Sequence, residues 1–169
     1  MEAKQVFHTI EPVYAADSKV LILGTMPSPK SREEGFYYAH PQNRFWRVLA
    51  GVFDEPTPMG TDARREFVLR HKIALWDVLA SCNIEGAADS SIKNPVANDI
   101  KMLLAGTEIK AIFTTGQAAY KLYMRYCADK AGVAVTALPS TSAANARMSA
   151  EALVDKYSVI RDAMGGIEF

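Results

Sequence analysis

The sequence predicts an α/β fold: a three-layer α/β/α sandwich around a central, mainly parallel four-stranded sheet. Two observations predict it. Short apolar, β-branched runs recur along the chain, and between them lie segments whose apolar residues repeat at helical spacing. Strands that alternate with helices form a parallel sheet covered on both faces. A chain of 169 residues can bury the core of one such unit, so residues 1–169 are expected to form a single domain.

The four expected strands are short apolar runs, each followed by residues that break regular structure. A strand buried on both faces of a sheet reads as a continuous apolar run, without polar alternation. Gly24 follows the first run, Gly116 lies just beyond the third, and Pro139 stops the fourth. The expected strands are residues 19–23, 73–78, 110–114 and 133–138.

Helices are expected where apolar residues recur at i, i+3, i+4 and i+7. The first begins at Pro41, since proline is favoured in the first helical turn. The second covers residues 62–71, and Gly165-Gly166 ends the last. The apolar positions that mark the first, third, fourth and last helices are 45, 48, 49 and 52; 96, 100, 103 and 104; 119, 122, 123 and 126; and 153, 157, 160 and 164.

Composition restricts the function classes. The 19 basic and 19 acidic residues cancel, which argues against a non-specific DNA coat but leaves a local basic patch open. Two cysteines are too few for an iron–sulfur cluster or a disulfide framework, and the three histidines lack metal-ligand spacing. No apolar run approaches the ~18 residues that span a membrane, and residues 1–12 lack a signal-peptide core. We therefore expect a soluble cytoplasmic protein without a metal site.

The loop after the first strand holds the strongest functional signal, because open α/β sheets bind ligands beyond the carboxyl ends of their strands. Residues 24–46 read GTMPSPKSREEGFYYAHPQNRFW. The two prolines stiffen a pocket wall. Three successive aromatics, residues 36–38, are too many for a loop to bury, so one is expected to stack on a planar ligand. Asn43 lies in the first turn of the expected helix, where its amide can orient a water or bond a base edge. A simple helix-start residue is the alternative.

This loop resembles the first signature of the mismatch-specific and hypoxanthine branches of the uracil-DNA glycosylase superfamily. The shared features are a Gly-x-x-Pro loop starting at Gly24, an aromatic before Ala-His-Pro, and x-Asn-x-Phe-Trp around Asn43. They extend over more than twenty consecutive positions. The resemblance implies that a flipped base stacks on Tyr38.

Met26 distinguishes the two branches. Mismatch-specific members usually have an Asn at this position that holds the attacking water, and a thioether cannot do so. The hypoxanthine branch is similar to this chain in having a non-polar residue there. Its key amide is the Asn of His-Pro-x-Asn, which corresponds to Asn43. The resemblance therefore implies that Asn43 is catalytic and that the base removed is hypoxanthine, the base of deoxyinosine.

A second loop follows the fourth strand, where residues 138–149 read LPSTSAANARMS. Its backbone N–H groups could receive a phosphate, and Arg147 could reach a phosphate or the minor groove. A capping loop with Ser149 as the N-cap is the alternative. The segment resembles the superfamily's second signature, a Pro-Ser loop that pinches the DNA backbone and inserts a wedge into the gap left by the flipped nucleotide. Relatives often have His or Asn where Leu138 stands, and Leu138 again fits the hypoxanthine branch.

Residues 76–86 follow the second strand, are expected at the same rim, and extend the resemblance over most of residues 10–165. Ser81 and Asn83 could bond the base edge or be solvated loop residues, and Asp77 is expected to be structural. The expected base-binding residues are Gly24, Met26, Pro27, Tyr38, Ser81 and Asn83, and the expected DNA-binding residues are Ser28, His40, Pro139, Ser140, Thr141, Ser142, Asn145 and Arg147.

These features predict a monofunctional glycosylase of base-excision repair, which hydrolyses the N-glycosidic bond of a flipped hypoxanthine in double-stranded DNA. Nothing marks a Schiff-base lysine, so no lyase step is expected, and the hydrolysis requires no cofactor. The protein is expected to be a monomer that joins the nucleoid when bound to DNA and makes no contact with a membrane. Two alternatives stay open: a uracil or G:U/G:T mismatch glycosylase of the same fold, and a non-catalytic nucleic-acid-binding or nucleotide-binding α/β module.

Overall fold

The centre of the molecule is a parallel sheet of four strands in the order β3-β2-β6-β7. The computed structural model describes residues 3–164. Every residue of β2 and β3 is buried, which explains why both read as uninterrupted apolar runs. The four strands lie within one residue of the expected N-terminal and C-terminal limits, except that β7 starts two residues late. Their bounds are β2 Val20–Gly24, β3 Ile73–Asp77, β6 Ala111–Thr115 and β7 Val135–Leu138.

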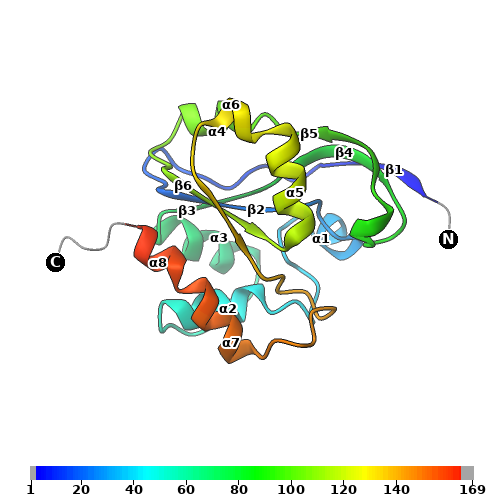
Figure 1. The fold of residues 1–169 in the computed structure, drawn as a ribbon. Coiled ribbons are helices and arrows are strands. Elements are labelled where there is room, and N and C mark those ends of the chain that lie inside the picture. The colour runs from blue at the N-terminus through cyan, green and yellow to red at the C-terminus, as the bar shows by residue number, and fades with distance from the viewer. Residues whose placement is uncertain (1–2, 165–169) are drawn as a thin grey trace.

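Helices cover both faces of this sheet, as the alternation of strands and helices predicted (Figure 1). One face carries α4 (Ile100–Ala105), α5 (Gln117–Tyr126) and α6 (Ala128–Ala131). The opposite face carries α2 (Phe45–Val52), α3 (Thr61–Arg70), α7 (Ala150–Tyr157) and α8 (Val159–Ala163). The three-layer α/β/α fold is therefore confirmed.

A second, antiparallel sheet was not predicted. It consists of β1 (Lys4–Phe7), β4 (Leu79–Ile84) and β5 (Lys93–Ala97) in the order β1-β4-β5, with the 3-10 turn η1 (Asp89–Ser91) before β5. Only Val78 separates β3 from β4, so one continuous extended segment passes from the central sheet into the second sheet. Their joint pattern lacks the break that marks two strands in a sequence.

The expected helix at residues 96–104 was too long at its start. Val96 lies in β5 and is 55% exposed, and α4 begins only at Ile100. Asp99 caps that helix, because its carboxylate accepts a hydrogen bond from the Met102 backbone N–H. The apolar residue at 96 matched the helical spacing by coincidence.

Two further helix boundaries differ from the prediction. The helix expected from Pro41 begins at Phe45, and residues 41–44 form a turn and an irregular segment ahead of it. The last expected helix is divided at Ser158 into α7 and α8. Its expected end at Gly165-Gly166 lies outside the described residues.

Two short helices were also missed, α6 and α1 (Pro29–Glu34). The Ser28 N-cap of α1 accepts a hydrogen bond from the Ser31 backbone N–H, and its C-cap is Gly35 in the left-handed region. Helix α1 lies inside the loop that the sequence motif covers.

The N-terminal segment lies against the junction of the two sheets. The backbone N–H of His8 donates to the carbonyl of Ala80, and Val13 exchanges two backbone hydrogen bonds with Leu75 of β3. Tyr37 also holds this segment, because its buried hydroxyl donates to the Glu11 carbonyl at 2.9 Å. The path brings His8 to the carboxyl end of the central sheet.

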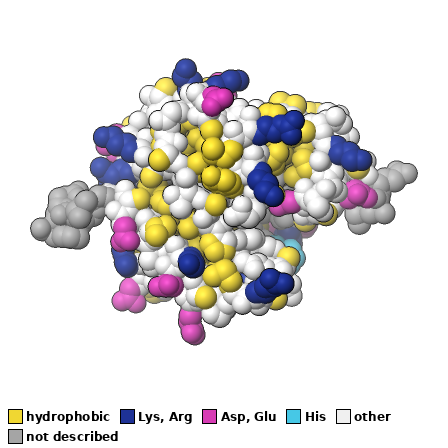
Figure 2. All heavy atoms as spheres, viewed as in Figure 1, with side chains coloured by type: hydrophobic (Ala, Val, Ile, Leu, Met, Phe, Trp, Pro, Cys, Tyr) yellow, Lys and Arg dark blue, Asp and Glu magenta, His cyan; other side chains and the backbone are white. Residues whose placement is uncertain are grey.

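The surface shows both signs of charge mixed over one face, with hydrophobic side chains between them (Figure 2). This distribution agrees with the zero net charge. In residues 3–164, no helix is both long and apolar enough to cross a membrane.

Candidate active site

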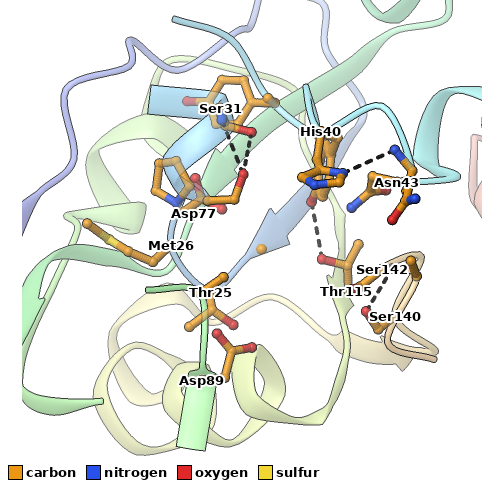
Figure 3. A pocket seen from close by; sticks show the side chains of 18 of the residues that line it. Thr25, Met26, Ser31, His40, Asn43, Asp77, Asp89, Thr115, Ser140 and Ser142 are labelled. Atoms are coloured by element: carbon orange, nitrogen blue, oxygen red, sulfur yellow. Dashed lines mark hydrogen bonds between the residues drawn. The ribbon is translucent and has the colours of Figure 1, made fainter. Parts of the chain in front are cut away.

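The candidate active site is a cavity of about 360 Å³ beyond the carboxyl ends of the central strands. Gly24 ends β2, Asp77 ends β3 and Thr115 ends β6, and all three line the cavity. Neighbouring parallel strands end at the same edge of the sheet, which is where ligands bind in folds of this class. Figure 3 shows Asn43, Ser140 and Ser142 on one side of the cavity and Met26 on the other. The two loops singled out in the sequence therefore meet at one site.

Tyr38 presents an aromatic ring to the cavity, with Phe45 behind it. The two ring centroids lie 3.8 Å apart and the ring planes differ by 11°. Tyr38 has a φ of 52°, in the left-handed region that non-glycine residues seldom adopt, and such residues cluster at functional sites. Its hydroxyl lies 3.1 Å from that of Thr115. Burial, assisted by the charge of Asp77, raises the pKa of Tyr38 well above its usual range, so the phenol stays neutral.

Gly24 is required by the close approach of its neighbours. A Cβ atom at this position would lie 2.5 Å from Asp77 Oδ1 and 3.2 Å from the Tyr38 hydroxyl oxygen. Gly24 and Asp77 are register partners in the sheet, so the contact follows directly from the strand pairing. The glycine was expected to contact the base, and its role in the structure includes making room for two polar groups of the pocket.

Asp77 was expected to be structural, and in the structure its side chain also reaches the candidate active site. Its side chain is 5% exposed and lines the cavity. Asp77 Oδ2 lies 2.8 Å from Nε2 of His8, whose side chain is 3% exposed. The second oxygen, Oδ1, faces Gly24. The only sequence signal that Asp77 could line a cavity was its place as an acidic residue at the end of a buried strand. No sequence signal indicated its contact with His8.

Asn43 lines the cavity from the segment just before α2. Its side-chain oxygen accepts two hydrogen bonds, from the Phe45 backbone N–H at 2.9 Å and from the Thr141 hydroxyl at 2.8 Å. The first contact is that of a helix-start residue, which was the alternative interpretation of Asn43. The two interpretations are compatible, because the amide supports the helix start with its oxygen, while its nitrogen has no hydrogen-bond partner among residues 3–164.

The second loop borders the cavity through Ser140 and Ser142. The Ser142 backbone N–H donates to the Ser140 hydroxyl, and the Asn145 amide donates to the Ser140 carbonyl, so the loop is held in a compact turn. Arg147 is exposed. Pro139 is half-buried, and its carbonyl accepts a hydrogen bond from Tyr157 of α7.

Thr141 departs from its predicted role. It was expected to contact DNA, yet it is only 1% exposed and its hydroxyl donates to Asn43. The sequence alone could not reveal this difference, since Ser140, Thr141 and Ser142 are all small polar residues that look equally able to face DNA.

Arg44 connects the two loops and was not among the expected site residues. Its backbone N–H donates to the Thr141 carbonyl at 3.0 Å. Its guanidinium donates to the carbonyls of Ser142, Asn145 and Met148. Three carbonyls of the curved loop converge on this one side chain, because guanidinium has five donors in a planar fork.

The remaining predicted residues divide into two groups. Met26, Pro27, Ser28 and His40 line the cavity, and the Ser28 hydroxyl is also engaged as the cap of α1. Ser81 and Asn83 do not line it. Both lie in β4 and pair with β1, whereas Ile84 of the same strand does line the cavity. Successive side chains of a strand point to opposite faces, so Ser81 and Asn83 point away from the face that Ile84 presents to the cavity.

Asp89 is a further acidic residue at the cavity, opposite Thr25 in Figure 3. Loss of hydration among the cavity walls raises the pKa of its carboxyl group, and the Thr25 hydroxyl opposes this shift. Across residues 3–164, no three His, Cys, Asp or Glu side chains are grouped so that they could hold a metal ion.

Comparison with known proteins identifies the family of this chain. Residues 11–162 match the model of a protein family described as the uracil DNA glycosylase superfamily. The chain belongs to this superfamily. The match includes both loops that border the cavity and all four strands of the central sheet.

Two curated relatives are named hypoxanthine DNA glycosylase. The protein from Methanosarcina acetivorans is 31% identical over 137 residues, which cover 79% of this chain and 84% of that protein. The protein from Methanosarcina barkeri is 37% identical over 93 residues, which cover 54% of this chain and 59% of that protein. The second match thus spans less than two thirds of its relative.

A solved structure shares the fold. It is the solution NMR structure of a Methanosarcina acetivorans protein named provisionally as a uracil DNA glycosylase. The TM-score is 0.79 with 28% sequence identity, and the superposition covers 92% of this chain and 97% of the other. This similarity confirms the α/β architecture of the chain.

Proposed function

We propose that this superfamily member is a monofunctional DNA glycosylase that removes hypoxanthine from double-stranded DNA. The observation that carries the proposal is the set of three groups around one cavity: an aromatic face at Tyr38, an acceptor at Asp77 and an amide at Asn43. The names of the two curated relatives support the same base. The target nucleotide would rotate out of the duplex into this cavity, as enzymes that act on a base require.

The base would stack on the cavity side of the Tyr38 ring, since Phe45 covers the other side at 3.8 Å between centroids. A ring supported from behind cannot retreat, so the stacking contact is preorganised. Asp77 Oδ1 would accept the N1–H of hypoxanthine, with Oδ2 held by His8. Deamination of adenine converts N1 from an acceptor into an N–H donor, so a carboxylate at this point favours the deaminated base over its parent.

The reaction is hydrolysis of the bond between C1′ of the sugar and N9 of the base. This bond breaks with its electron pair leaving on the base, a water oxygen bonds to C1′, and one water proton ends on the released base. The sugar passes through an oxocarbenium-like state, as in other glycoside hydrolyses. Such a step depends on stabilising negative charge on the departing base, which an N–H donor can do. Asn43 is the proposed catalytic residue.

The second loop would hold the DNA backbone. Ser140 and Ser142 border the cavity, and Arg147 is exposed on the same loop, so a phosphate next to the flipped nucleotide would lie within this group. Because the net charge of the chain is zero, binding depends on this local arrangement and not on a general positive surface.

A base-release panel tests the function. Duplexes with a single deoxyinosine, deoxyuridine or deoxyxanthosine are incubated with the protein, and strand scission is scored on denaturing gels with and without alkali. We expect the deoxyinosine strand to become alkali-labile and to stay intact without alkali. With the Asn43→Ala variant, the strand should stay intact under both conditions. Release of uracil alone would assign the uracil or mismatch activity, and binding without release of any base would identify a non-catalytic module.

A further inference from the structure

We propose that Thr141 is a positioning residue, which makes Asn43 an N–H donor to the substrate and links the second loop to bond cleavage. The inference rests on the proposed glycosylase function and deepens it. It begins from the oxygen of the Asn43 amide. That atom accepts one hydrogen bond from the Phe45 backbone N–H and another from the Thr141 hydroxyl, at 2.9 and 2.8 Å. A carbonyl oxygen has two lone pairs, so both are occupied.

The orientation of the amide follows from its neighbours. The Phe45 backbone N–H can only donate, so the oxygen of Asn43 must face it and the nitrogen must face away. Among residues 3–164, the Asn43 nitrogen has no hydrogen-bond partner, and Asn43 lines the cavity. The group that Asn43 offers to a ligand is therefore the amide N–H. The sequence left open a second role, in which Asn43 accepts a hydrogen bond from the attacking water. The oxygen that this role requires is already occupied by Phe45 and Thr141.

Thr141 is built into a rigid network. Its side chain is 1% exposed, and its carbonyl accepts the Arg44 backbone N–H at 3.0 Å. The Arg44 guanidinium holds three further carbonyls of the same loop, those of Ser142, Asn145 and Met148. Residues 43 and 44 thus bond the second loop at five points, four through Arg44 and one through Asn43. Any displacement of this loop reaches the Asn43 amide through Thr141.

The consequence is that two functions share one set of contacts. Ser140 and Ser142 flank Thr141 in the sequence and line the cavity, while Thr141 itself points inward to Asn43. When the second loop is correctly placed on the DNA, the Thr141 hydroxyl holds the Asn43 N–H toward the base. When the loop is displaced, this hydrogen bond is lost and the amide can rotate. Thr141 touches no substrate in this scheme, so its contribution is to the rate of cleavage and not to the affinity for DNA.

The test combines Thr141→Val, which removes the hydroxyl at nearly constant volume, with Thr141→Ser, which restores it. Rates are measured under single turnover on a deoxyinosine duplex. Affinity is measured on a duplex containing 2′-fluoro-2′-deoxyinosine, whose fluorine slows the formation of an oxocarbenium ion.

We expect Thr141→Val to cleave roughly tenfold more slowly, a scale typical of coupling between contacting groups. Thr141→Ser should cleave near the wild-type rate, and all affinities should agree within about twofold. The matched control is Thr136→Val, the same change at an exposed position of β7 outside the cavity.

A double-mutant cycle separates positioning from simple loss of structure. In the Asn43→Ala background, Thr141→Val should cause no additional loss of rate, because the amide that it positions is gone. An equal loss in both backgrounds, or a wild-type rate for Thr141→Val, overturns the inference. If Thr141→Val does not fold, Thr141→Ala takes its place in the same cycle.

A readout without activity keeps this inference separate from the proposed function. The Asn43 side-chain NH₂ signals are assigned in a ¹H–¹⁵N spectrum by their disappearance in Asn43→Ala. They should shift in Thr141→Val and return in Thr141→Ser, and unchanged signals would contradict the network. If the wild-type protein releases none of the three bases, the function fails, while these spectra still decide whether Thr141 orients the amide.

Discussion

At the scale of single residues, the site depends on which atom of each side chain is already engaged. Asn43 uses its oxygen within the protein, Asp77 uses Oδ2 on His8, and Tyr38 uses one ring face on Phe45. What remains is an N–H, a carboxylate oxygen and an aromatic face. A planar base with a ring N–H and acceptors on its edge complements these three groups. The chemistry of the cavity is thus determined by the partners that lie behind it.

The first prediction concerns Asn43. Removing one preorganised polar contact in an active site typically costs about 10²–10³ in rate. Asn43→Ala should therefore fold, bind the deoxyinosine duplex and lose at least this factor in single-turnover release of hypoxanthine. Asn43→Asp should remain equally slow, since it keeps both oxygen contacts but replaces the N–H with a negative charge facing the departing base. Restored activity in Asn43→Asp would contradict the donor role and favour positioning of water.

The second prediction concerns the ring of Tyr38. Tyr38→Ala should lose roughly 1–3 kcal/mol of base capture, the range measured for stacking of a base on an aromatic side chain. Tyr38→Phe keeps the ring over Phe45 and loses only the hydroxyl contact with Thr115, a neutral hydrogen bond of about 0.5–1.5 kcal/mol at most. The affinity of each variant for the 2′-fluoro-deoxyinosine duplex measures its loss of binding free energy. Equal damage from Phe and Ala would show that the hydroxyl group carries recognition.

At the scale of elements, the two loops have unlike supports. The first is stiffened by its prolines and by α1, which Ser28 and Gly35 cap at its two ends. The second has no regular structure from Pro139 to Met148 and depends on Arg44 and on its own turn. The loop proposed to hold DNA is therefore the one whose shape depends on side-chain contacts, which allows a change at Arg44 or Thr141 to reach the site.

The third prediction belongs to this second loop. Arg147→Ala should weaken binding to all duplex sequences alike and should reduce the slope of log affinity against log salt by about one, as expected for the loss of one phosphate contact. Filter binding or anisotropy at several salt concentrations measures both effects. The comparison is Arg125→Ala, the same change on α5 and away from the cavity. Unaltered affinity and slope in Arg147→Ala would remove this side chain from the interface.

At the scale of the whole molecule, the candidate active site lies where two sheets join. Asp77 ends the central strand β3, and the same chain continues through Val78 into β4 of the second sheet. The N-terminal segment spans both sheets and delivers His8 to Asp77. The second sheet is consequently part of the site's support, even though Ser81 and Asn83 do not line the cavity.

The fourth prediction follows from this shared construction: the two sheets should unfold as one unit, as expected for a single domain. Cys82 lies in β4 and Cys127 follows α5, and burial raises the pKa of both thiols, which lowers their thiolate fraction. Both should resist alkylation in the native protein and become reactive at the same urea concentration. Mass spectrometry of labelled peptides measures each midpoint. A lower midpoint for Cys82 alone would mean that the second sheet opens independently.

The sequence by itself determined the features that repeat locally. The four central strands follow from uninterrupted apolar runs, and most helices follow from the spacing of apolar residues, because burial on a strand or a helix face imposes those patterns on neighbouring positions. The order of strands and helices also placed the two loops at the same end of the sheet. Tyr38 and Asn43 were found through the motif that surrounds them, and both line the cavity.

Only the tertiary structure decided which side chains meet. The pair formed by His8 and Asp77 joins residues 69 positions apart, and the contact between Asn43 and Thr141 joins residues 98 positions apart. Neither pair leaves a periodic trace, since a single hydrogen bond constrains one residue on each side and not its neighbours. For the same reason the buried Thr141 could not be told from the serines that flank it. The direction of the Asn43 amide, on which the proposed chemistry depends, follows from packing and not from the motif.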